Sequence, residues 1–224
     1  MARQIVLTWS GGKDSVMALD FLMGTKDWDV VGLLTTVTLP YNRVSMHGVR
    51  RQLLLEQANS LGLPLEIIWL GAEDPNETYE RKMAEKLREF WAKGVRHVAF
   101  GDIFLESLRT YREENLARVG MEGFFPLWGK DTSQAVRELS SRGFKAIITC
   151  VDTQFLDGSF LGKEVNEDLL ALLPQGVDPC GENGEFHSFV YGGPLFTKQI
   201  GFQKGTVVER EGGRFLFLDL IPLK

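Results

Sequence analysis

The sequence has 224 residues, of which 44% are hydrophobic and 25% charged, so it has the composition of an ordinary folded protein with a sizeable core. Its formal net charge of -5 excludes an overall positive field that would attract nucleic acid. The cysteines, Cys150 and Cys180, are too few for a disulfide framework and lack the spacing of a zinc or redox motif.

A strand-like run begins almost directly after Met1, which leaves no room for the charged and apolar regions of a signal peptide. No uninterrupted apolar stretch is long enough to cross a bilayer. We therefore expect a cytoplasmic protein that contacts no membrane and no nucleic acid. The sequence does not fix the oligomeric state, for which a homodimer is one option.

Apolar runs of strand length alternate with longer stretches of helical period, which is the pattern of a parallel sheet with helices on both faces. The predicted strands are Ile5–Trp9, Val30–Val37, Leu65–Leu70, His97–Phe100 and Ala146–Val151. The predicted helices are Asp14–Met23, Val49–Leu61, Asn76–Lys93 and Asp131–Arg142. Asn76 and Asp131 are expected to cap the last two of these helices.

After about Asp152 glycine and proline become dense, and the last periodic signal is a pair of alternating runs. Thr206–Arg210 and Phe215–Ile221 flank Gly212 and Gly213, which predicts a terminal β-hairpin. The expected fold class is α/β, with a nucleotide-binding, Rossmann-like domain over residues 1–152. A smaller α+β substrate-binding region over 153–224 ends in the hairpin.

The segment Ser10-Gly11-Gly12-Lys13-Asp14-Ser15 follows the first strand and opens a helix, so it lies at the carboxyl edge of the sheet, where such proteins bind ligands. Its glycines let backbone N–H groups approach phosphate oxygens, and the helix N-terminus and Lys13 add positive charge. Neither the Walker A pattern nor the dinucleotide pattern G-x-G-x-x-G fits these residues. The segment predicts a phosphate-binding loop for ATP; the alternative is a glycine-rich turn with a solvated lysine.

This loop resembles the PP-loop of the ATP pyrophosphatases, which cleave ATP between the α and β phosphates. Four further segments occur in the order of one family within that group: 46–50 (MHGVR), 100–103 (FGDI) continuing to 113, 125–129 (FPLWG) and 181–188 (GENGEFHS). Together the five segments are similar to the diphthine-ammonia ligase family, also described as N-type ATP pyrophosphatases or adenine nucleotide alpha hydrolases.

The resemblance implies an ATP- and Mg²⁺-dependent ligase that adenylates a carboxylate on a protein side chain or a small molecule, after which ammonia displaces AMP. Two departures are informative. This chain has Gly184-Glu185-Phe186-His187-Ser188 where the ligases have a G-E-x-E-T-like segment, and Gly101-Asp102-Ile103 where they have G-A-I-x-S. They suggest a sister group with a different substrate and the same ATP chemistry.

The loop residues and the end of the fourth predicted strand form the expected nucleotide site. Lys13 and Asp14 are expected to be catalytic. Lys13 would neutralise phosphate charge, and Asp14 would hold Mg²⁺ or its bound water or orient the loop, with a plain helix cap as its alternative. Asp102 is expected to contact nucleotide or metal, with a cap again the alternative. The residues expected to bind ATP are Ser10, Gly11, Gly12, Lys13, Asp14, Ser15, His47, Gly101 and Asp102, of which His47 rests on the resemblance and could instead be structural.

The expected substrate site draws on residues farther along the chain: Arg112, Trp128, Glu182, Glu185 and His187. Arg112 could clamp a carboxylate or join a surface ion-pair cluster with Arg109 and Glu113, which share its helix face. Trp128 could stack on a ring or pack in the core. Glu182 and Glu185 are expected to be catalytic, binding an ammonium nucleophile or acting as its general base. The alternative for that glycine-rich segment, which lacks the periodicity of a core element, is a solvated acidic loop.

Two other functions compete with the ligase. A tRNA-thiolating PP-loop enzyme would need Cys150 and Cys180 to carry sulfur, and a nucleotide-binding regulator would hold ATP without turning it over. The acidic charge and the absence of a C-x-x-C motif count against the first. The dense polar set from Glu182 to Ser188 counts against the second.

Overall fold

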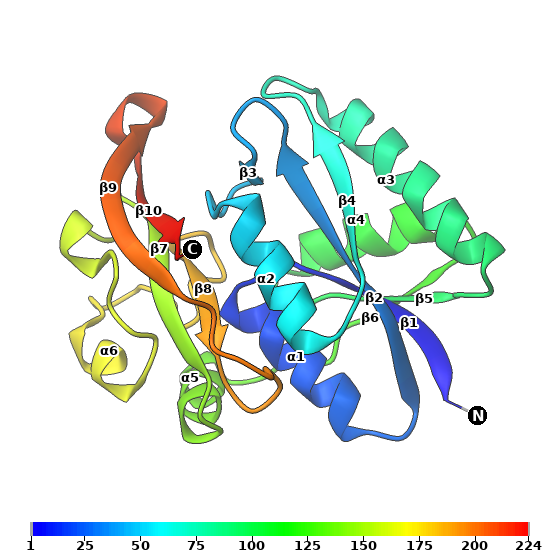
Figure 1. Cartoon of the computed structure of the whole chain (residues 1–224), viewed down its shortest axis with the longest axis horizontal. Coiled ribbons are helices and arrows are strands. Elements are labelled where there is room, and N and C mark those ends of the chain that lie inside the picture. The colour runs from blue at the N-terminus through cyan, green and yellow to red at the C-terminus, as the bar shows by residue number, and fades with distance from the viewer. Residues whose placement is uncertain (1, 224) are drawn as a thin grey trace.

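The computed structural model describes residues 2–223, whose strands form two separate sheets (Figure 1). The first has the order β3-β2-β1-β5-β6, with β4 also paired to β2, and the second has the order β8-β7-β10-β9. The strands of the first sheet are β1 (Arg3–Thr8), β2 (Trp28–Thr38), β3 (Arg43–Val44), β4 (Leu65–Leu70), β5 (His97–Ala99) and β6 (Glu122–Phe124). Those of the second are β7 (Lys145–Asp152), β8 (Phe186–Gly192), β9 (Phe202–Arg210) and β10 (Phe215–Pro222). The helices are α1 (Lys13–Gly24), α2 (Arg51–Leu61), α3 (Asn76–Ala92), α4 (Glu106–Ala117), α5 (Thr132–Ser141) and α6 (Glu167–Leu172), with 3₁₀ turns η1 (Gly158–Phe160) and η2 (Glu211–Gly213).

The first sheet confirms the predicted α/β class. Strands β4, β2, β1, β5 and β6 run parallel, and only β3 is antiparallel to its neighbour. Along β1, Ile5 and Leu7 pack into a core with α1 and α2, whereas Val6 packs on the opposite face with α3 and α4. This alternation follows from the two-residue period of a strand, and it explains why the run is apolar throughout.

The second sheet is antiparallel, and its last two strands are the predicted hairpin, closed by η2. The strand predicted at Ala146–Val151 exists as β7, but its expected place in the parallel sheet is wrong, because it pairs with β8 and β10. Its length and apolar character do not identify its partners. Since the sheets change between β6 and β7, we propose that the second unit begins with α5, before residue 153.

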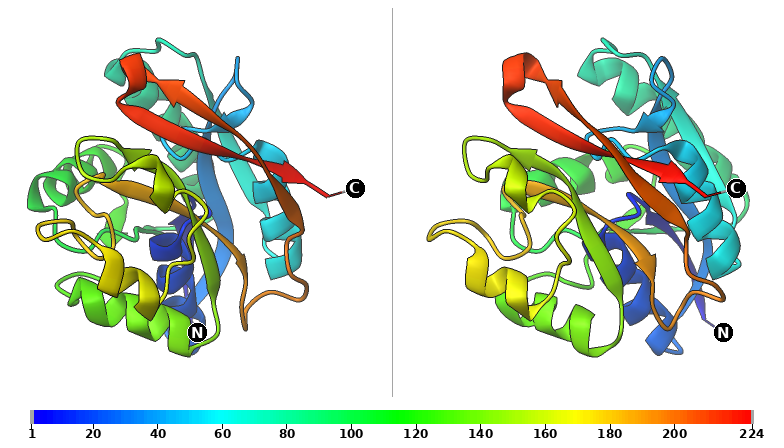
Figure 2. Two further views of the ribbon diagram at one scale, coloured as in Figure 1. Left: turned by 90° about the vertical axis from the view of Figure 1, so that its left-hand side faces the viewer. Right: turned by 60° about the vertical axis from the view of Figure 1, so that its left-hand side comes forward.

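The two units share one core, in which α1 lies between the sheets. A continuous cluster of buried side chains runs from β1 and α1 to β7, β8, α5 and α6. At its centre the amide of Val190 on β8 donates to the carbonyl of Gly11, at 2.9 Å. Figure 2 shows the second sheet crossing in front of α1 and β1. The phosphate-loop segment is therefore covered by the second unit.

Two local predictions fail and one is confirmed. Asp131 caps α5 by accepting from the amide of Gln134 at 2.7 Å, as predicted. Asn76 is not a cap: Pro75 holds that position, and the Asn76 amide donates to Glu80 and Tyr111 instead. The segment around Glu185 is not free of core residues, because β8 begins at Phe186, which is fully buried. Helix α6 and strands β3, β6 and β8 are additional to the predicted elements, and α4 is the helix on which Arg109, Arg112 and Glu113 were expected to share a face.

None of the helices within residues 2–223 combines the length and apolar character needed to cross a membrane.

Candidate active site

The segment Ser10 to Ser15 connects β1 to α1 at the carboxyl edge of the sheet, as predicted. Gly11 has φ of 76°, a value that favours glycine, and Gly12 is the N-cap residue of α1. The amide of Gly12 lies 3.3 Å from Oγ of Ser10, and Oγ of Ser15 donates to the carbonyl of Gly12 at 2.9 Å. The loop thus presents a helix N-terminus and two hydroxyl groups, a combination suited to anions.

A buried glutamine that the sequence analysis did not single out holds this loop. The side-chain amide of Gln57 on α2 donates to the carbonyls of Gly11 and Val190, and its oxygen accepts from Nε1 of Trp9 at 3.0 Å. Gln57 is fully buried among the apolar residues of α2. A lone polar residue on the apolar face of a helix was the available signal, because a buried amide must find partners. On the other side, the amide of Lys13 donates to Oγ of Ser188.

Within the loop, the buried Lys13 forms an ion pair with Asp14, whose side chain is 28% exposed. Nζ of Lys13 lies 2.9 Å from Oδ2 of Asp14, and Lys13 is only 2% exposed, so it is not a solvated lysine. Burial lowers the pKa of Lys13, but the negative charges of Asp14 and Glu182 outweigh this and leave the pKa above its ordinary value. Burial raises the pKa of Asp14 against the attraction of Lys13. The lysine is therefore charged at neutral pH.

The end of β5 meets the loop because β1 and β5 are neighbouring parallel strands. A Cβ on Gly101 would lie 2.8 Å from the backbone of Asp14, so only glycine permits this approach. Asp102 follows, but its carboxylate is paired with Arg112 on α4, with Oδ2 and Nε 2.6 Å apart. The structure brings these predicted residues together, and Arg112 is engaged by Asp102 rather than free to clamp a substrate.

Glu182 joins this edge from the loop between α6 and β8. Its Oε1 accepts a 2.7 Å hydrogen bond from the amide of Ile103. Burial is the main reason why the pKa of Glu182 is raised to about 7; the hydrogen bond from Ile103 opposes this rise, and the charges of Asp14 and Asp102 contribute to it. Glu182 can therefore exchange a proton near neutral pH.

Glu185 is occupied within its own loop. It is 1% exposed, and its two oxygens accept from the amide of Asp178 and from the backbone and side-chain amides of Asn183, at 2.9 to 3.0 Å. Asp178 in turn accepts from the amides of Cys180 and Glu182. This geometry makes Glu185 a residue that shapes the loop carrying Glu182.

His47 and His187 come together, although they were predicted for different parts of the site. Their ring centroids lie 4.3 Å apart at an angle of 43°. Burial, together with the charge of Lys13, lowers the pKa of both rings, that of His187 to about 4. Nδ1 of His47 has no hydrogen-bond partner within residues 2–223. Two neutral imidazoles thus lie beside the lysine of the loop.

Trp128 lies behind this edge and faces the guanidinium of Arg109, 4.7 Å from its ring centre. The amide of Gly129 donates to the carbonyl of Ile103, which ties the Trp128 segment to the partner of Glu182. A cavity of about 300 Å³ lies between α3 and α4 and reaches Arg112 and Phe100. Trp128, Glu182, Glu185 and His187 are not part of its lining.

A magnesium ion fits this site through few protein ligands. Across residues 2–223 no group of three or more His, Cys, Asp or Glu side chains is arranged to hold a metal. Oδ1 of Asp14, however, is buried without a hydrogen-bond partner in the described chain. Mg²⁺ bound with nucleotides often takes one or two carboxylates together with water and phosphate oxygens, so Asp14 suits it. Asp102, the other predicted ligand, is held by Arg112.

Fold and site define an α/β protein in which a glycine-rich loop, a buried lysine and carboxylates from two units meet at the carboxyl edge of a parallel sheet. A family model for the diphthamide synthase N-terminal domain matches residues 2–123, and the corresponding C-terminal domain model matches residues 131–214. The chain therefore belongs to the diphthamide synthase family. The gap between the two matched ranges falls between the strands of the two sheets, although β10 lies beyond the end of the second range.

Curated relatives are named diphthine–ammonia ligase. The Homo sapiens protein is 30% identical over 188 residues, which cover 78% of this chain and 69% of the relative. The Schizosaccharomyces pombe protein is 33% identical over 127 residues, 55% of this chain and 21% of the relative. The Mus musculus protein is 33% identical over 111 residues, 47% and 42% of the two chains. The chain thus spans well under two thirds of the fission yeast and mouse relatives.

Proposed function

We propose that this protein is an ATP-dependent ligase that adenylates a carboxylate, releases pyrophosphate and lets ammonia displace AMP. The observation that carries the proposal is the ion pair between the buried Lys13 and the partly exposed Asp14 in the loop, joined there by Glu182 from the other unit. The names of its relatives support the same reaction class.

The loop and Lys13 bind and polarise the phosphates. Adenylation needs the carboxylate oxygen placed in line with the α phosphorus and the charge of the leaving pyrophosphate neutralised, so positioning and electrostatics dominate. Backbone amides of the loop and Nζ of Lys13 provide positive potential without reorganising, because the lysine is already buried and held. Asp14 would hold Mg²⁺, which would supply further charge neutralisation when bound.

Glu182 acts as the general base in the second step. Its raised pKa lets it accept a proton from an ammonium ion at neutral pH. The freed nitrogen lone pair attacks the carbonyl carbon of the acyl adenylate, the bond from that carbon to the phosphate oxygen breaks, and AMP leaves with the electron pair. The new amide nitrogen then loses one further proton to solvent. The Ile103 amide fixes the orientation of Glu182 during this transfer.

The acceptor is a carboxylate on a protein side chain or a small molecule. The relatives' name indicates diphthine and ammonia as their substrates. The segments 101–103 and 184–188 contain or adjoin the groups that meet at the site edge. Their departures from the ligase pattern therefore favour a different acceptor for this chain.

The test is a screen for substrate-dependent release of pyrophosphate and AMP over carboxylate substrates with ammonium present. Lys13→Ala serves as the blank, and Lys26→Ala, which removes an exposed lysine near the end of α1, is the matched control. We expect release in the wild type and the control only. Activity that survives in Lys13→Ala, or no pyrophosphate release from any substrate, contradicts the mechanism.

The thiolation alternative is disfavoured by both cysteines. Cys150 and Cys180 are at most 1% exposed, and burial raises the pKa of the Cys150 thiol to about 12 and that of Cys180 beyond its ordinary range as well. A sulfur carrier needs an accessible thiolate. ATP binding without pyrophosphate release would favour the regulator instead.

A further inference from the structure

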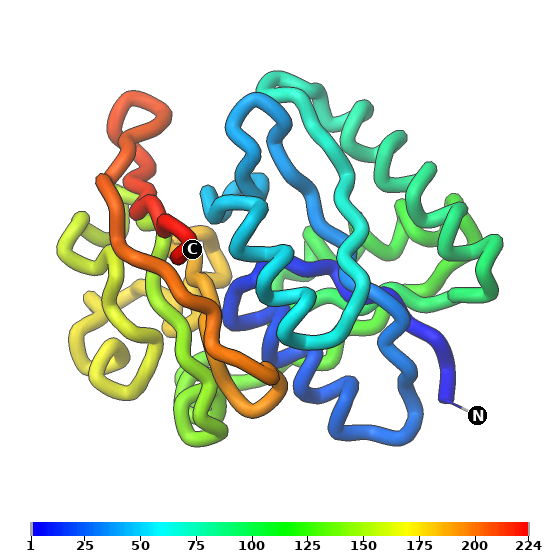
Figure 3. The backbone as a smooth tube through the Cα atoms, viewed as in Figure 1, coloured from blue at the N-terminus to red at the C-terminus, as the bar shows by residue number. Residues whose placement is uncertain are grey.

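The segment Arg43–Arg50, which carries His47, is a small closed loop on the first unit. An antiparallel bridge joins Arg43 to Arg50, and the amide of Val44 donates to the carbonyl of Val49 at 2.8 Å. Figure 3 follows this segment to where it lies beside the C-terminal end of the chain. There a Cβ on Gly48 would lie 2.4 Å from the ring of Phe217 on β10, so the segment packs closely against the second unit.

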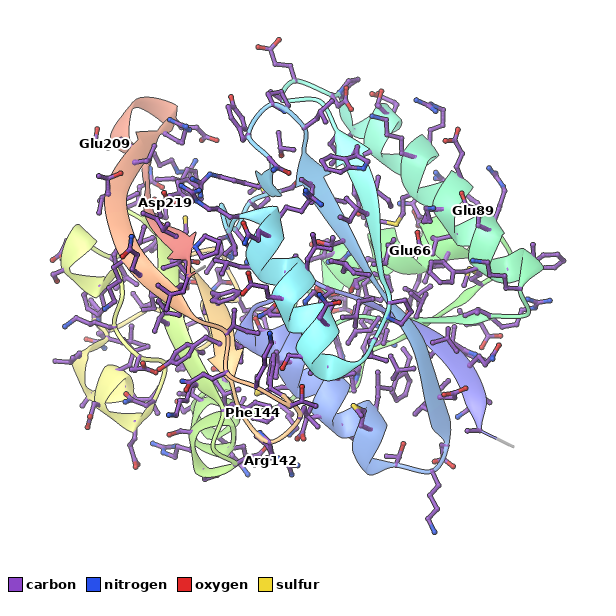
Figure 4. All side chains as sticks on the ribbon, in the orientation of Figure 1. Glu66, Glu89, Arg142, Phe144, Glu209 and Asp219 are labelled. Carbon is purple, nitrogen blue, oxygen red and sulfur yellow. The ribbon has the colours of Figure 1, made fainter. Side chains whose placement is uncertain are left out.

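One carboxylate, that of Asp219 on β10, ties both ends of the segment to the second sheet. Its Oδ1 accepts from Nη2 of Arg43 at 2.8 Å and from Nε of Arg50 at 2.9 Å, and its Oδ2 accepts from Nη2 of Arg50 at 2.7 Å. Arg43 also donates from Nη1 to the carbonyl of Gly48 at 2.8 Å. Figure 4 labels Asp219 on the second unit.

A bulge in the neighbouring strand β9 lies opposite this carboxylate. The pairing of β10 with β9 shifts between Leu218 and Leu220, so that Gly205 and Thr206 of β9 lie opposite Asp219 alone. Bulges redirect side chains and are common beside active sites. On the facing strand, a Cβ at Gly205 would lie 3.1 Å from the carbonyl of Asp219, so glycine permits the close approach.

Asp219 carries the negative charge that holds Arg43 and Arg50 in place. Its side chain is 11% exposed, whereas those of Arg43 and Arg50 are 29% and 41% exposed. The hydrogen bond from Arg50, together with Arg43, lowers the pKa of Asp219, so it is ionised at neutral pH. Removing its charge would leave two guanidinium groups facing each other across a neutral side chain.

We propose that Asp219 is a positioning residue for nucleotide binding: by holding Arg43 and Arg50 it keeps His47 against His187 beside the phosphate loop. The second unit thereby sets the place of a segment belonging to the first. The role in binding rests on the proposed ATP-dependent function, whereas the effect on the two histidine rings does not.

The test compares Asp219→Asn with Asp152→Asn in the full chain. Asp152 is a buried carboxylate on β7 of the same sheet, paired with Arg214 at 2.9 Å, and its ion pair does not join the units. Proton NMR is suited to the readout because the chain has only three histidines. We expect the nuclear Overhauser effect between the His47 and His187 rings in the wild type and in Asp152→Asn, and its loss in Asp219→Asn.

The second readout is ATP affinity measured by calorimetry, with steady-state kinetics alongside. The charge-assisted hydrogen bonds from Arg43 and Arg50 to Asp219 hold the segment that carries His47. Their loss should weaken ATP binding and raise the KM for ATP about tenfold, with kcat changed less than about twofold. If Asp219→Asn does not fold, Arg43→Lys takes its place, because lysine keeps the charge but cannot reach Asp219 and Gly48 together.

The inference is overturned if the folded variant, Asp219→Asn or its substitute Arg43→Lys, keeps either the contact between the His47 and His187 rings or the ATP affinity of the wild type. Failure of the proposed function looks different: the wild type itself then neither binds ATP nor releases pyrophosphate, while the ring contact still depends on Asp219.

Discussion

The amide of Ile103 and the carboxylate of Glu182 are joined by a 2.7 Å hydrogen bond that crosses from the first unit to the second. It places a carboxyl group whose pKa lies near 7 at the edge that Lys13 and Asp14 occupy. In the proposed reaction, the N-terminal loop binds phosphate and the C-terminal loop supplies a group able to move a proton. The proposed chemistry requires both.

Glu182→Gln should separate the two steps of the proposed reaction. The amide keeps the hydrogen bond from Ile103 but cannot accept a proton, so amide formation at pH 7 should fall by about 100-fold, the lower end of what a general base contributes. Adenylate formation, followed as exchange of labelled pyrophosphate into ATP, should persist. Wild-type amide formation should rise through pH 7 as Glu182 loses its proton, and the variant should lack that rise. Glu73→Gln, at an exposed position, is the control.

The same substitution should stabilise the protein at alkaline pH. The folded-state pKa of Glu182 is raised, so its contribution to stability is complete below the unfolded-state value near 4.5 and is lost as pH rises through about 7. At pH 8, Glu182→Gln should therefore raise the free energy of unfolding by about 1 kcal/mol, a figure reduced for partial solvent exposure. Urea titrations at pH 5 and pH 8 check this; an equal effect at both would contradict the raised pKa.

Gln57→Leu should destabilise the phosphate loop, because the Gln57 side chain hydrogen-bonds to the loop backbone. The substitution leaves the carbonyls of Gly11 and Val190 and the Trp9 indole N–H buried without this partner. We expect a loss of about 2–4 kcal/mol in the free energy of unfolding, measured by urea titration, together with weaker ATP binding. Gln52→Leu on the exposed face of the same helix should change stability by less than about 0.5 kcal/mol. Equal effects of the two substitutions would rule out a bracing role for Gln57.

Much of the first unit could be predicted from sequence because its signals are local. The strand Leu65–Leu70 has the predicted bounds, and the loop from Ser10 to Ser15 lies where a strand followed by a helix must place it. The approach of Gly101 to Asp14 follows from the pairing of β1 with β5. Parallel neighbouring strands bring their carboxyl ends to one edge, and a sequence pattern can express that rule.

What the sequence could not show depends on contacts between distant segments. Nothing near Ala146–Val151 indicates that β7 joins an antiparallel sheet, and nothing near Arg112 indicates that Asp102 occupies it. Glu185 has the residue type of a catalytic acid, yet backbone amides of its own loop take up its oxygens. Residue type predicts which chemistry a side chain can perform. Its hydrogen-bond and ion-pair partners in the fold determine whether the side chain is available to perform it.

Gly101→Ala should disturb the site, because the added methyl group would collide with the backbone of Asp14. The added methyl group would lie 2.8 Å from the Asp14 carbonyl carbon, so the start of α1 or the end of β5 must shift. We expect a loss of about 1–3 kcal/mol in the free energy of unfolding and weaker ATP binding, measured by urea titration and calorimetry. Gly24→Ala, at the last residue of α1 where nothing lies within 4 Å, should be neutral or stabilising. Wild-type affinity in Gly101→Ala would show that the two segments need not touch.

The partly buried imidazole of His187 should make the protein sensitive to mild acid. Its folded-state pKa is lowered from 6.5 to about 4, so the folded protein resists a proton that the unfolded chain accepts. Stability is therefore complete above pH 6.5 and falls as the pH drops from 6.5 to 4. His187→Asn should reduce this loss, measured as the difference in free energy of unfolding between pH 7 and pH 5. An NMR titration, assigned by the disappearance of one signal in the variant, should place the His187 midpoint near pH 4. A midpoint near 6.5 would mean that the ring is solvated and that neither His47 nor Lys13 lies against it.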